Sequence, residues 1–275
     1  MKRSILCVTA LLALGTASAT AEEMATPPSQ FITTTEPYLT WLGFYAGING
    51  GYGWGNSSVS YSPNDPAAHT NAIPSTDFYR DGAIAGGQIG FNWQFNSHWL
   101  AGVEADFQWS DFDGTGQSSS HLTNIGSAAT LSTISANQTV SSFGTVRARM
   151  GAIIMNSLLL YGTGGLAFGQ VRENLSMPAA ATGALTSGSF SYSCVAGTTC
   201  FAGSSSKTLW GWSAGAGAEY AITSNLTFKT ELLYVYLEAP SATAVATGVA
   251  TPASFTATFA PVYFAVVRGG VNLRF

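Results

Sequence analysis

The residues in this sequence that could do chemistry are charged side chains at alternate positions of otherwise apolar segments. In an extended chain, side chains two positions apart point the same way, so these charges share one face with Gly, Ser, Thr and Asn. Buried charges persist only when they are paired and hydrogen-bonded, and the planar guanidinium of arginine suits carboxylates. We predict one charge network on the inner face, with four acids and four bases: Glu104, Asp106, Glu219, Glu231, Arg147, Arg149, Lys229 and Arg268.

This charge network supports two interpretations. A set of equal and opposite charges can fill an interior as a polar plug, which is a structural role. The same charges could also line a gated ion path or relay protons. The sequence favours the plug and leaves the second interpretation open.

Other combinations of reactive residues are weaker. Asp111 and Asp113, with His121 eight residues on, could activate water as acids and a base, but acids beside Gly are more often solvated turn residues. His69, His98 and His121 are scattered and form no Cys/His cluster with metal-ligand spacing. We therefore predict a protein that is not an enzyme and has no metal site and no resident cofactor.

Strands of alternating pattern must position the inner face. Apolar and small or polar residues alternate with period two in eight segments, which is typical of strands with one apolar face. The expected strands are residues 42–54, 82–95, 99–109, 142–154, 158–170, 208–222, 226–237 and 261–275.

The connections between these strands alternate in length. Links of three residues at 96–98, 155–157 and 223–225 alternate with links of 23 to 37 residues. This regularity is typical of an outer-membrane barrel, with short periplasmic turns and long extracellular loops. We expect the long segments 114–141 and 174–206, rich in Ser, Thr, Ala and Gly, to be mobile surface loops.

The composition also favours a membrane barrel. Charged residues make up 9% of the 275 residues, whereas a soluble domain has about 25%. No segment after the N-terminus has about 18 consecutive apolar residues, so a closed β-barrel is the remaining way to cross lipid. Nucleic acid is a poor partner, because 10 basic residues against 14 acidic ones offer no basic patch. Aromatic residues cluster at both ends of the expected strands, as the two girdles of a barrel do.

The N-terminus has the pattern of an export signal. Lys2 and Arg3 precede an apolar stretch and the small residues Ala19-Thr20-Ala21, so we predict a signal peptide at 1–21. A retained anchor is the alternative. Residues 22–40 are expected to form a periplasmic leader, and 41–275 the barrel domain. In an oxidising compartment we expect Cys194 and Cys200 to form a disulfide.

Several motifs resemble the opacity-like, outer-membrane immunogenic proteins of alphaproteobacteria, a family of small eight-stranded, porin-like barrels. They are Trp41-Leu42-Gly43-Phe44-Tyr45-Ala46-Gly47, Gly50-Gly51-Tyr52-Gly53-Trp54-Gly55, Val146-Arg147-Ala148-Arg149-Met150-Gly151, Leu160-Tyr161-Gly162-Thr163-Gly164-Gly165-Leu166-Ala167 and Arg268-Gly269-Gly270-Val271-Asn272-Leu273-Arg274-Phe275. The resemblance implies haem binding as an open possibility. It also implies an assembly signal, read by the outer-membrane assembly machinery, at Arg268, Gly270, Leu273 and Phe275.

The sequence thus predicts an all-β, eight-stranded antiparallel barrel in the bacterial outer membrane, surrounded by lipid. The expected role is that of a structural surface antigen, with at most limited passage of small solutes. The alternative is a surface receptor or adhesin that binds haem or a host ligand through its extracellular loops. A soluble secreted barrel would be extracted without detergent, and the oligomeric state is open.

Overall fold

The computed structural model describes residues 40–64, 74–122, 130–178, 183–187, 190–194, 197–246 and 254–275. The expected signal peptide, and all of the expected leader except Thr40, lie outside these residues. The described chain is all-β, and it contains no helix that is long and apolar enough to cross a membrane.

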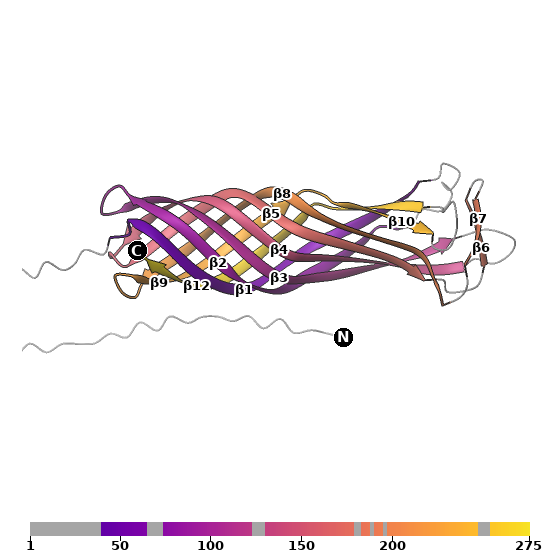
Figure 1. Ribbon diagram of the computed structural model, residues 1–275, viewed down its shortest axis with the longest axis horizontal. Helices are drawn as coiled ribbons and strands as arrows, with labels where there is room; N and C mark the ends of the chain where they lie inside the picture. Colours follow the sequence, from indigo (N-terminus) through magenta and orange to yellow (C-terminus); the bar gives the residue numbers. More distant parts are fainter. Residues whose placement is uncertain are drawn as a thin grey trace, which may run out of the picture. The chain divides into compact units, whose positions relative to one another are not determined.

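The main element is a closed antiparallel sheet (Figure 1). The strand order is β10-β11-β1-β12-β9-β8-β5-β4-β3-β2, and pairing of β1 with β2 closes the barrel. Figure 1 shows the end of the last strand beside the start of the first, where Arg274 pairs with Tyr45. The strands are β1 (Gly43–Pro63), β2 (Thr76–Gln94), β3 (Trp99–Leu122), β4 (Thr130–Ile154), β5 (Leu158–Pro178), β8 (Thr199–Ala221), β9 (Leu226–Leu237), β10 (Ser241–Ala246), β11 (Ser254–Phe259) and β12 (Val262–Arg274). A separate hairpin comprises β6 (Gly183–Ser187) and β7 (Phe190–Cys194).

The ten strand segments of the sheet make up eight barrel strands, because two of the barrel strands are each interrupted once. β9 and β10 continue one another, as do β11 and β12, because β9 and β10 both pair with β8 and both β11 and β12 pair with β1. Proline has no backbone N–H to donate, and the interruptions contain Pro240 and Pro261. The eight-stranded barrel expected from the sequence is therefore confirmed, and two of its strands are interrupted at prolines.

The strands are longer than the sequence predicted. The prediction of mobile loops at 114–141 and 174–206 is largely wrong, because strands occupy most of these segments. β3 and β4 continue together to the pair Leu122–Thr130, and β5 and β8 continue past residue 174 to Pro178 and Thr199. In β4 the period of two changes parity, because both Phe143 and Val140 point inward around a register shift between Val140 and Ser142, so alternation beyond it looked like loop.

The outer wall has the pattern expected of a lipid-facing surface. Its exposed aromatic residues gather at two levels. At the end with the short turns they include Phe44, Phe95, Trp93, Trp99, Tyr220 and Phe275; at the other end they include Trp54, Tyr79, Trp109, Trp210, Trp212 and Tyr263. These are two aromatic girdles, and beyond the second the strands continue as an extension.

The interior is filled in alternating apolar and polar layers, which can be followed along β4. From the short-turn end, its inward residues are Ile153, Gly151, Arg149, Arg147, Thr145, Phe143, Val140, Gln138, Ala136 and Ile134. The end layer comprises Trp41, Leu100, Ile153, Leu159, Tyr161 and Ala221. The middle layer includes Ile84, Phe112, Val140, Phe143, Val171, Leu209, Leu237 and Phe264. The extension has its own apolar core, which includes Val59, Tyr61, Phe78, Ile134, Leu175, Met177, Phe201 and Phe255.

Candidate functional site

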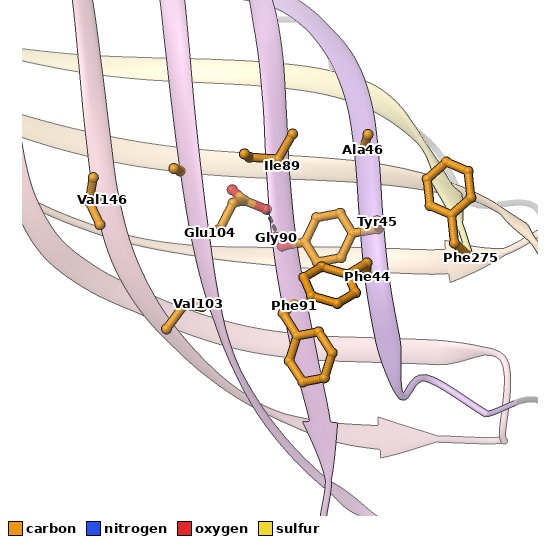
Figure 2. A pocket seen from close by; sticks show the side chains of 11 residues that line it. Phe44, Tyr45, Ala46, Ile89, Gly90, Phe91, Val103, Glu104, Val146 and Phe275 are labelled. Carbon is orange, nitrogen blue, oxygen red and sulfur yellow. Dashed lines mark hydrogen bonds between the residues drawn. The ribbon is translucent and has the colours of Figure 1, made fainter.

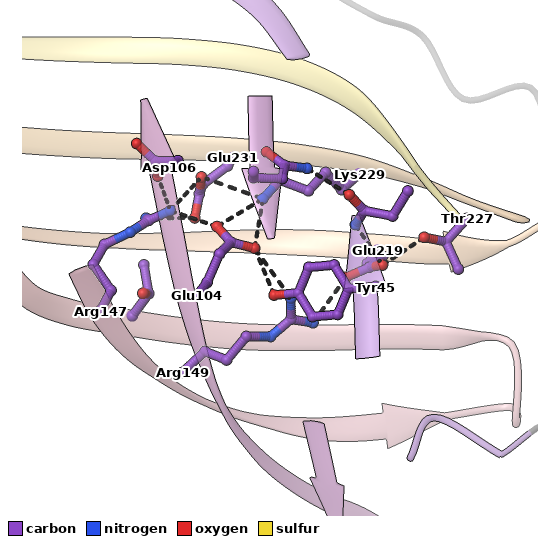
Figure 3. Close-up of polar contacts among 12 residues, drawn as sticks. Tyr45, Glu104, Asp106, Arg147, Arg149, Glu219, Thr227, Lys229 and Glu231 are labelled. Carbon is purple, nitrogen blue, oxygen red and sulfur yellow. Dashed lines mark hydrogen bonds and ion pairs between the residues drawn. The ribbon is translucent and has the colours of Figure 1, made fainter. Parts of the chain in front are cut away.

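The most chemically distinctive part of the barrel is the charge network between the end layer and the middle layer (Figure 3). β3, β4, β8, β9 and β12 each contribute side chains to it from their inner faces. The structure brings together all eight residues singled out in the sequence, and each is at most 6% exposed.

Arg147 lies at the centre of the network. Its guanidinium lies 2.6 Å from Glu104 Oε1, 2.8 Å from Asp106 Oδ2 and 2.8 Å from Glu231 Oε1. Asp106 also accepts a hydrogen bond from Thr145 on the neighbouring strand. One arginine thus neutralises carboxylates from β3 and from β9.

Two more bases complete this side of the network. Arg268 lies 2.9 Å from Asp106 Oδ2, and its Nη2 lies 2.5 Å from Glu231 Oε2. Lys229 Nζ lies 3.0 Å from Glu104 Oε1. Because each base meets more than one carboxylate, the charges are balanced collectively rather than in separate pairs.

Arg149 joins the network to the end layer. Its Nη2 lies 2.8 Å from Glu219 Oε2, and its Nη1 donates to the hydroxyl of Tyr45 at 2.9 Å. The Tyr45 hydroxyl in turn donates to Glu104 Oε2 at 2.7 Å. The guanidinium also lies 4.4 Å from the centre of the Tyr161 ring. Tyr45 was not predicted to belong to the network, although alternation places it on the inner face.

A glycine makes room for the Tyr45 ring. Gly90 lies directly opposite Tyr45 in the ladder, and a Cβ at Gly90 would lie 2.3 Å from Tyr45 Cζ. On the other side of this thin wall lies an apolar groove of about 450 Å³, lined by outward residues such as Ile89 and Phe91 (Figure 2). Figure 2 shows Glu104 and Tyr45 behind the groove, joined by their hydrogen bond. Tyr45 and Glu104 also line the groove, so the wall beside this part of the charge network is thin.

Three phenylalanines close the lumen above the charge network. The ring centres of Phe112 and Phe143 are 6.2 Å apart, and those rings lie 5.0 and 5.1 Å from Phe264. All three side chains are at most 2% exposed. This aromatic trio comes from β3, β4 and β12, so it spans the barrel rather than lining one side of it.

A second, smaller polar layer lies in the extension. Gln138 accepts hydrogen bonds from Arg80 at 2.6 Å and Ser57 at 3.1 Å. Glu173 lies beside Gln138 and Ser205 in the ladder, and neither of its oxygens has a well-formed hydrogen bond among the described residues. Burial raises the pKa of Glu173, against the smaller effects of these neighbours and of Lys207.

The other candidate residues lie apart from these layers. Asp111 and Asp113 point outward into solvent, where Asp113 accepts hydrogen bonds from Asn137 and Thr139. His98 is exposed in a short turn, whereas the side chains of His69 and His121 lie outside the described residues. The residues that the structure describes include no group of three His, Cys, Asp or Glu side chains able to hold a metal.

The remaining predictions from the sequence concern a disulfide and an assembly signal. Cys200 is disulfide-bonded, and Cys194, whose side chain lies outside the described residues, is the partner that we predict. In the assembly signal, Leu273 and Phe275 lie exposed on the outer wall, whereas Arg268 belongs to the charge network.

Two aromatic girdles, a lipid-type outer wall and a filled, charge-balanced lumen define an outer-membrane β-barrel protein. Residues 7–255 match the family described as outer membrane protein beta-barrel domain, and the chain belongs to this family. The protein is therefore located in the bacterial outer membrane, with its short turns in the periplasm.

The relatives agree with this placement. The 31 kDa outer-membrane immunogenic protein of Brucella melitensis is 32% identical over 235 residues, which cover 86% of this chain and 87% of the relative. The 22 kDa outer membrane protein of Rhizobium leguminosarum is 28% identical over 72% of this chain and 65% of the relative. Among solved structures, OprG from Pseudomonas aeruginosa aligns over 85% of this chain and 97% of its own, with 13% identity and a TM-score of 0.43.

Proposed function

We propose that this protein is a closed, non-catalytic barrel that supports a polar extension at the cell surface and acts there as a structural surface antigen. The aromatic trio Phe112, Phe143 and Phe264 carries the proposal. A hydrated ion crossing this layer would lose its water without gaining a polar partner, which is costly. Eight strands also enclose an interior just wide enough for side chains to fill.

The charge network supports the same role. Its four acids and four bases are buried and share many contacts, so little unbalanced charge remains to attract a solute. This arrangement favours the polar plug over an ion path. Limited solute passage would require both the trio and the network to rearrange.

Conductance across planar bilayers tests the closed lumen. We expect the purified, folded wild-type protein to show small or rare openings. Replacing two of the three rings in F143S/F264S should make openings more frequent, because the middle layer is then weakened while the end layer and the apolar core of the extension remain. Phe107→Ala is the matched control, since Phe107 is an outward aromatic residue of β3. Large, steady conductance of the wild type would refute the closed barrel.

Binding of a host ligand at the extension is the second candidate function. The apolar core of the extension holds its strands together beyond the outer girdle. Its outer face carries a polar ladder in which Asp113, Asn137 and Thr139 bond to one another. Saturable binding of a host macromolecule by the folded barrel, lost when Asn137 and Thr139 become Ala, would support the receptor. Haem has less support, because the one described His side chain, His98, lies at the periplasmic end.

The partners follow from this placement. We propose that the outer wall contacts membrane lipid and that the last strand is the segment read by the assembly machinery. Phe275, which directly follows β12, is 75% exposed and donates its backbone N–H to the carbonyl oxygen of Phe44.

A further inference from the structure

Trp41 is a buried residue that takes no part in the barrel wall. It precedes the first residue of β1, Gly43, yet its side chain is 0% exposed. The indole packs inside the periplasmic mouth, in the end layer with Leu100, Ile153, Leu159, Tyr161 and Ala221. The other five residues of that layer belong to strands, so Trp41 can leave it without breaking a ladder.

Three contacts hold Trp41 in the mouth. Its backbone N–H donates to Gln94 Oε1 at 2.9 Å, and its indole Nε1 donates to the carbonyl oxygen of Asn156 at 3.1 Å. The guanidinium carbon of Arg274 lies 4.7 Å from the centre of the Trp41 ring. These partners come from β2, from the turn after β4 and from β12.

Arg274 also holds the residue before Trp41. Its Nη1 donates to the carbonyl oxygen of Thr40 at 3.1 Å, and its Nη2 donates to that of Ser224 at 2.7 Å. The same side chain therefore ties Thr40, the Trp41 ring and the turn between β8 and β9 together. The contacts cross the mouth from one side to the other.

Gly43 lets the chain turn into the mouth. Its φ is +125°, which L side chains rarely adopt, and a Cβ there would lie 2.8 Å from the carbonyl oxygen of Phe275. Leu42, between the two, points outward and is 55% exposed. The chain thus changes direction within two residues, from the lumen to the wall.

The end layer separates the charge network from the periplasm. Tyr161 belongs to this layer and already touches Arg149 of the network. On the far side of the network, the aromatic trio blocks the lumen. Access of water to the network from the periplasm therefore depends on the end layer.

We propose that Thr40 and Trp41 form a releasable strap that closes the periplasmic mouth and controls access of water and small cations to the charge network. This regulation rests on the closed lumen proposed above, because opening the strap exposes the network to one side only. Tension on the chain that enters at Thr40 acts on Trp41 first. Release of the strap hydrates the network without creating a pore.

Thiol accessibility tests the strap. Thr227 is fully buried beside the network, where its hydroxyl donates to Glu219. The variant T227C, made in a background with C194S and C200S, is treated in detergent micelles with a small cationic methanethiosulfonate, and the rate of thiol labelling is measured. Adding W41A should raise the labelling rate about tenfold or more, because local opening sets the rate. W41F keeps an apolar ring and should remain slow.

Leu42→Ala is the matched control, since it changes the adjacent side chain on the outer wall. Equal labelling rates in the W41A and L42A backgrounds, or rapid labelling with Trp41 present, would overturn the strap. Unboiled gel mobility checks that each variant is folded. Conductance of the wild type is a separate outcome that would overturn the closed barrel instead.

A measurement on the intact protein covers the case in which W41A does not fold. The backbone N–H and the indole N–H of Trp41 are both hydrogen-bonded inside the mouth. In nuclear magnetic resonance spectra assigned with W41F, both should exchange slowly with solvent deuterium. Exchange as fast as that of an unprotected amide would also contradict the strap.

Discussion

Arg147 and Glu231 are joined across the lumen, with 2.8 Å between Arg147 Nη1 and Glu231 Oε1. In the sheet, β5 and β8 lie between their strands, β4 and β9. The two side chains therefore meet in the interior and not along a ladder. This contact ties together parts of the barrel that share no backbone hydrogen bond.

We expect Arg147→Ala to destabilise the barrel strongly. The change leaves Glu104, Asp106 and Glu231 with fewer positive partners, and breaking a fully buried ion pair costs about 3–5 kcal/mol. Water that enters the space should reduce this cost. The temperature at which the unboiled sample loses its folded gel mobility should fall.

Arg172→Ala is the control, because Arg172 is an exposed outward arginine of the neighbouring strand. It should leave that temperature nearly unchanged. The double variant R147M/E231L should recover part of the stability that R147M alone loses, since it removes a base and an acid together. Equal losses in R147A and R172A would contradict a network that contributes to stability.

A second prediction concerns the close contact at Gly90. Gly90→Ala should destabilise the barrel by about 1–3 kcal/mol, because the new methyl overlaps the Tyr45 ring. Gly87→Ala in the same strand is the control, since a Cβ there meets its nearest atom at an ordinary 3.5 Å. Chemical denaturation in micelles compares the two. A G90A variant as stable as G87A would show that the Tyr45 ring moves freely.

The charge network could be predicted from sequence because period-two alternation fixes which face a side chain occupies. Glu104 and Arg147 are in different segments, and each is flanked in sequence by apolar residues that face outward. The ladder then places the two charged residues opposite each other. The extension was missed for the same reason. The irregularity between Val140 and Ser142 shifts the period of β4 by a residue, and Ser and Thr beyond it gave no apolar face.

Contacts that depend on packing rather than alternation could not be predicted. Tyr45 joins the network because Gly90 opposite it leaves space, and that pairing requires the register of β1 and β2. Alternation with Tyr45 places Trp41 on the inner face, but its hydrogen bonds to Gln94 and Asn156 depend on how β2 and the turn after β4 pack around it.

A third prediction concerns the disulfide. Cys200 should be joined to Cys194, and mass spectrometry of the unreduced protein should find no free thiol in the mature chain. In the chain-entropy model, so small a loop stabilises by about 2–3 kcal/mol at most. C194S/C200S should therefore keep the heat-dependent gel mobility of the wild type. Two thiols that alkylate without reduction would disprove the pairing.

The fourth prediction is a pH dependence that originates in the extension, at Glu173. Its folded-state pKa is raised by burial, whereas the unfolded chain has the ordinary value of about 4.3. As pH rises through the interval between these values, the unfolded state ionises while the folded state keeps its proton. The free energy of unfolding should therefore fall with rising pH in that interval and remain lower above it.

Glu173→Gln removes this titration while keeping a side chain of similar size that can donate a hydrogen bond to Ser205. We expect the variant to be more stable than the wild type at pH 8 and to lose most of that advantage at pH 4, where wild-type Glu173 is protonated in the folded protein. Urea denaturation in micelles at the two pH values measures the difference. Glu238→Gln, at an exposed position just beyond β9, should show no such dependence. A constant difference between E173Q and wild type at both pH values would mean that Glu173 stays ionised, with its charge balanced by Arg80 and Lys207.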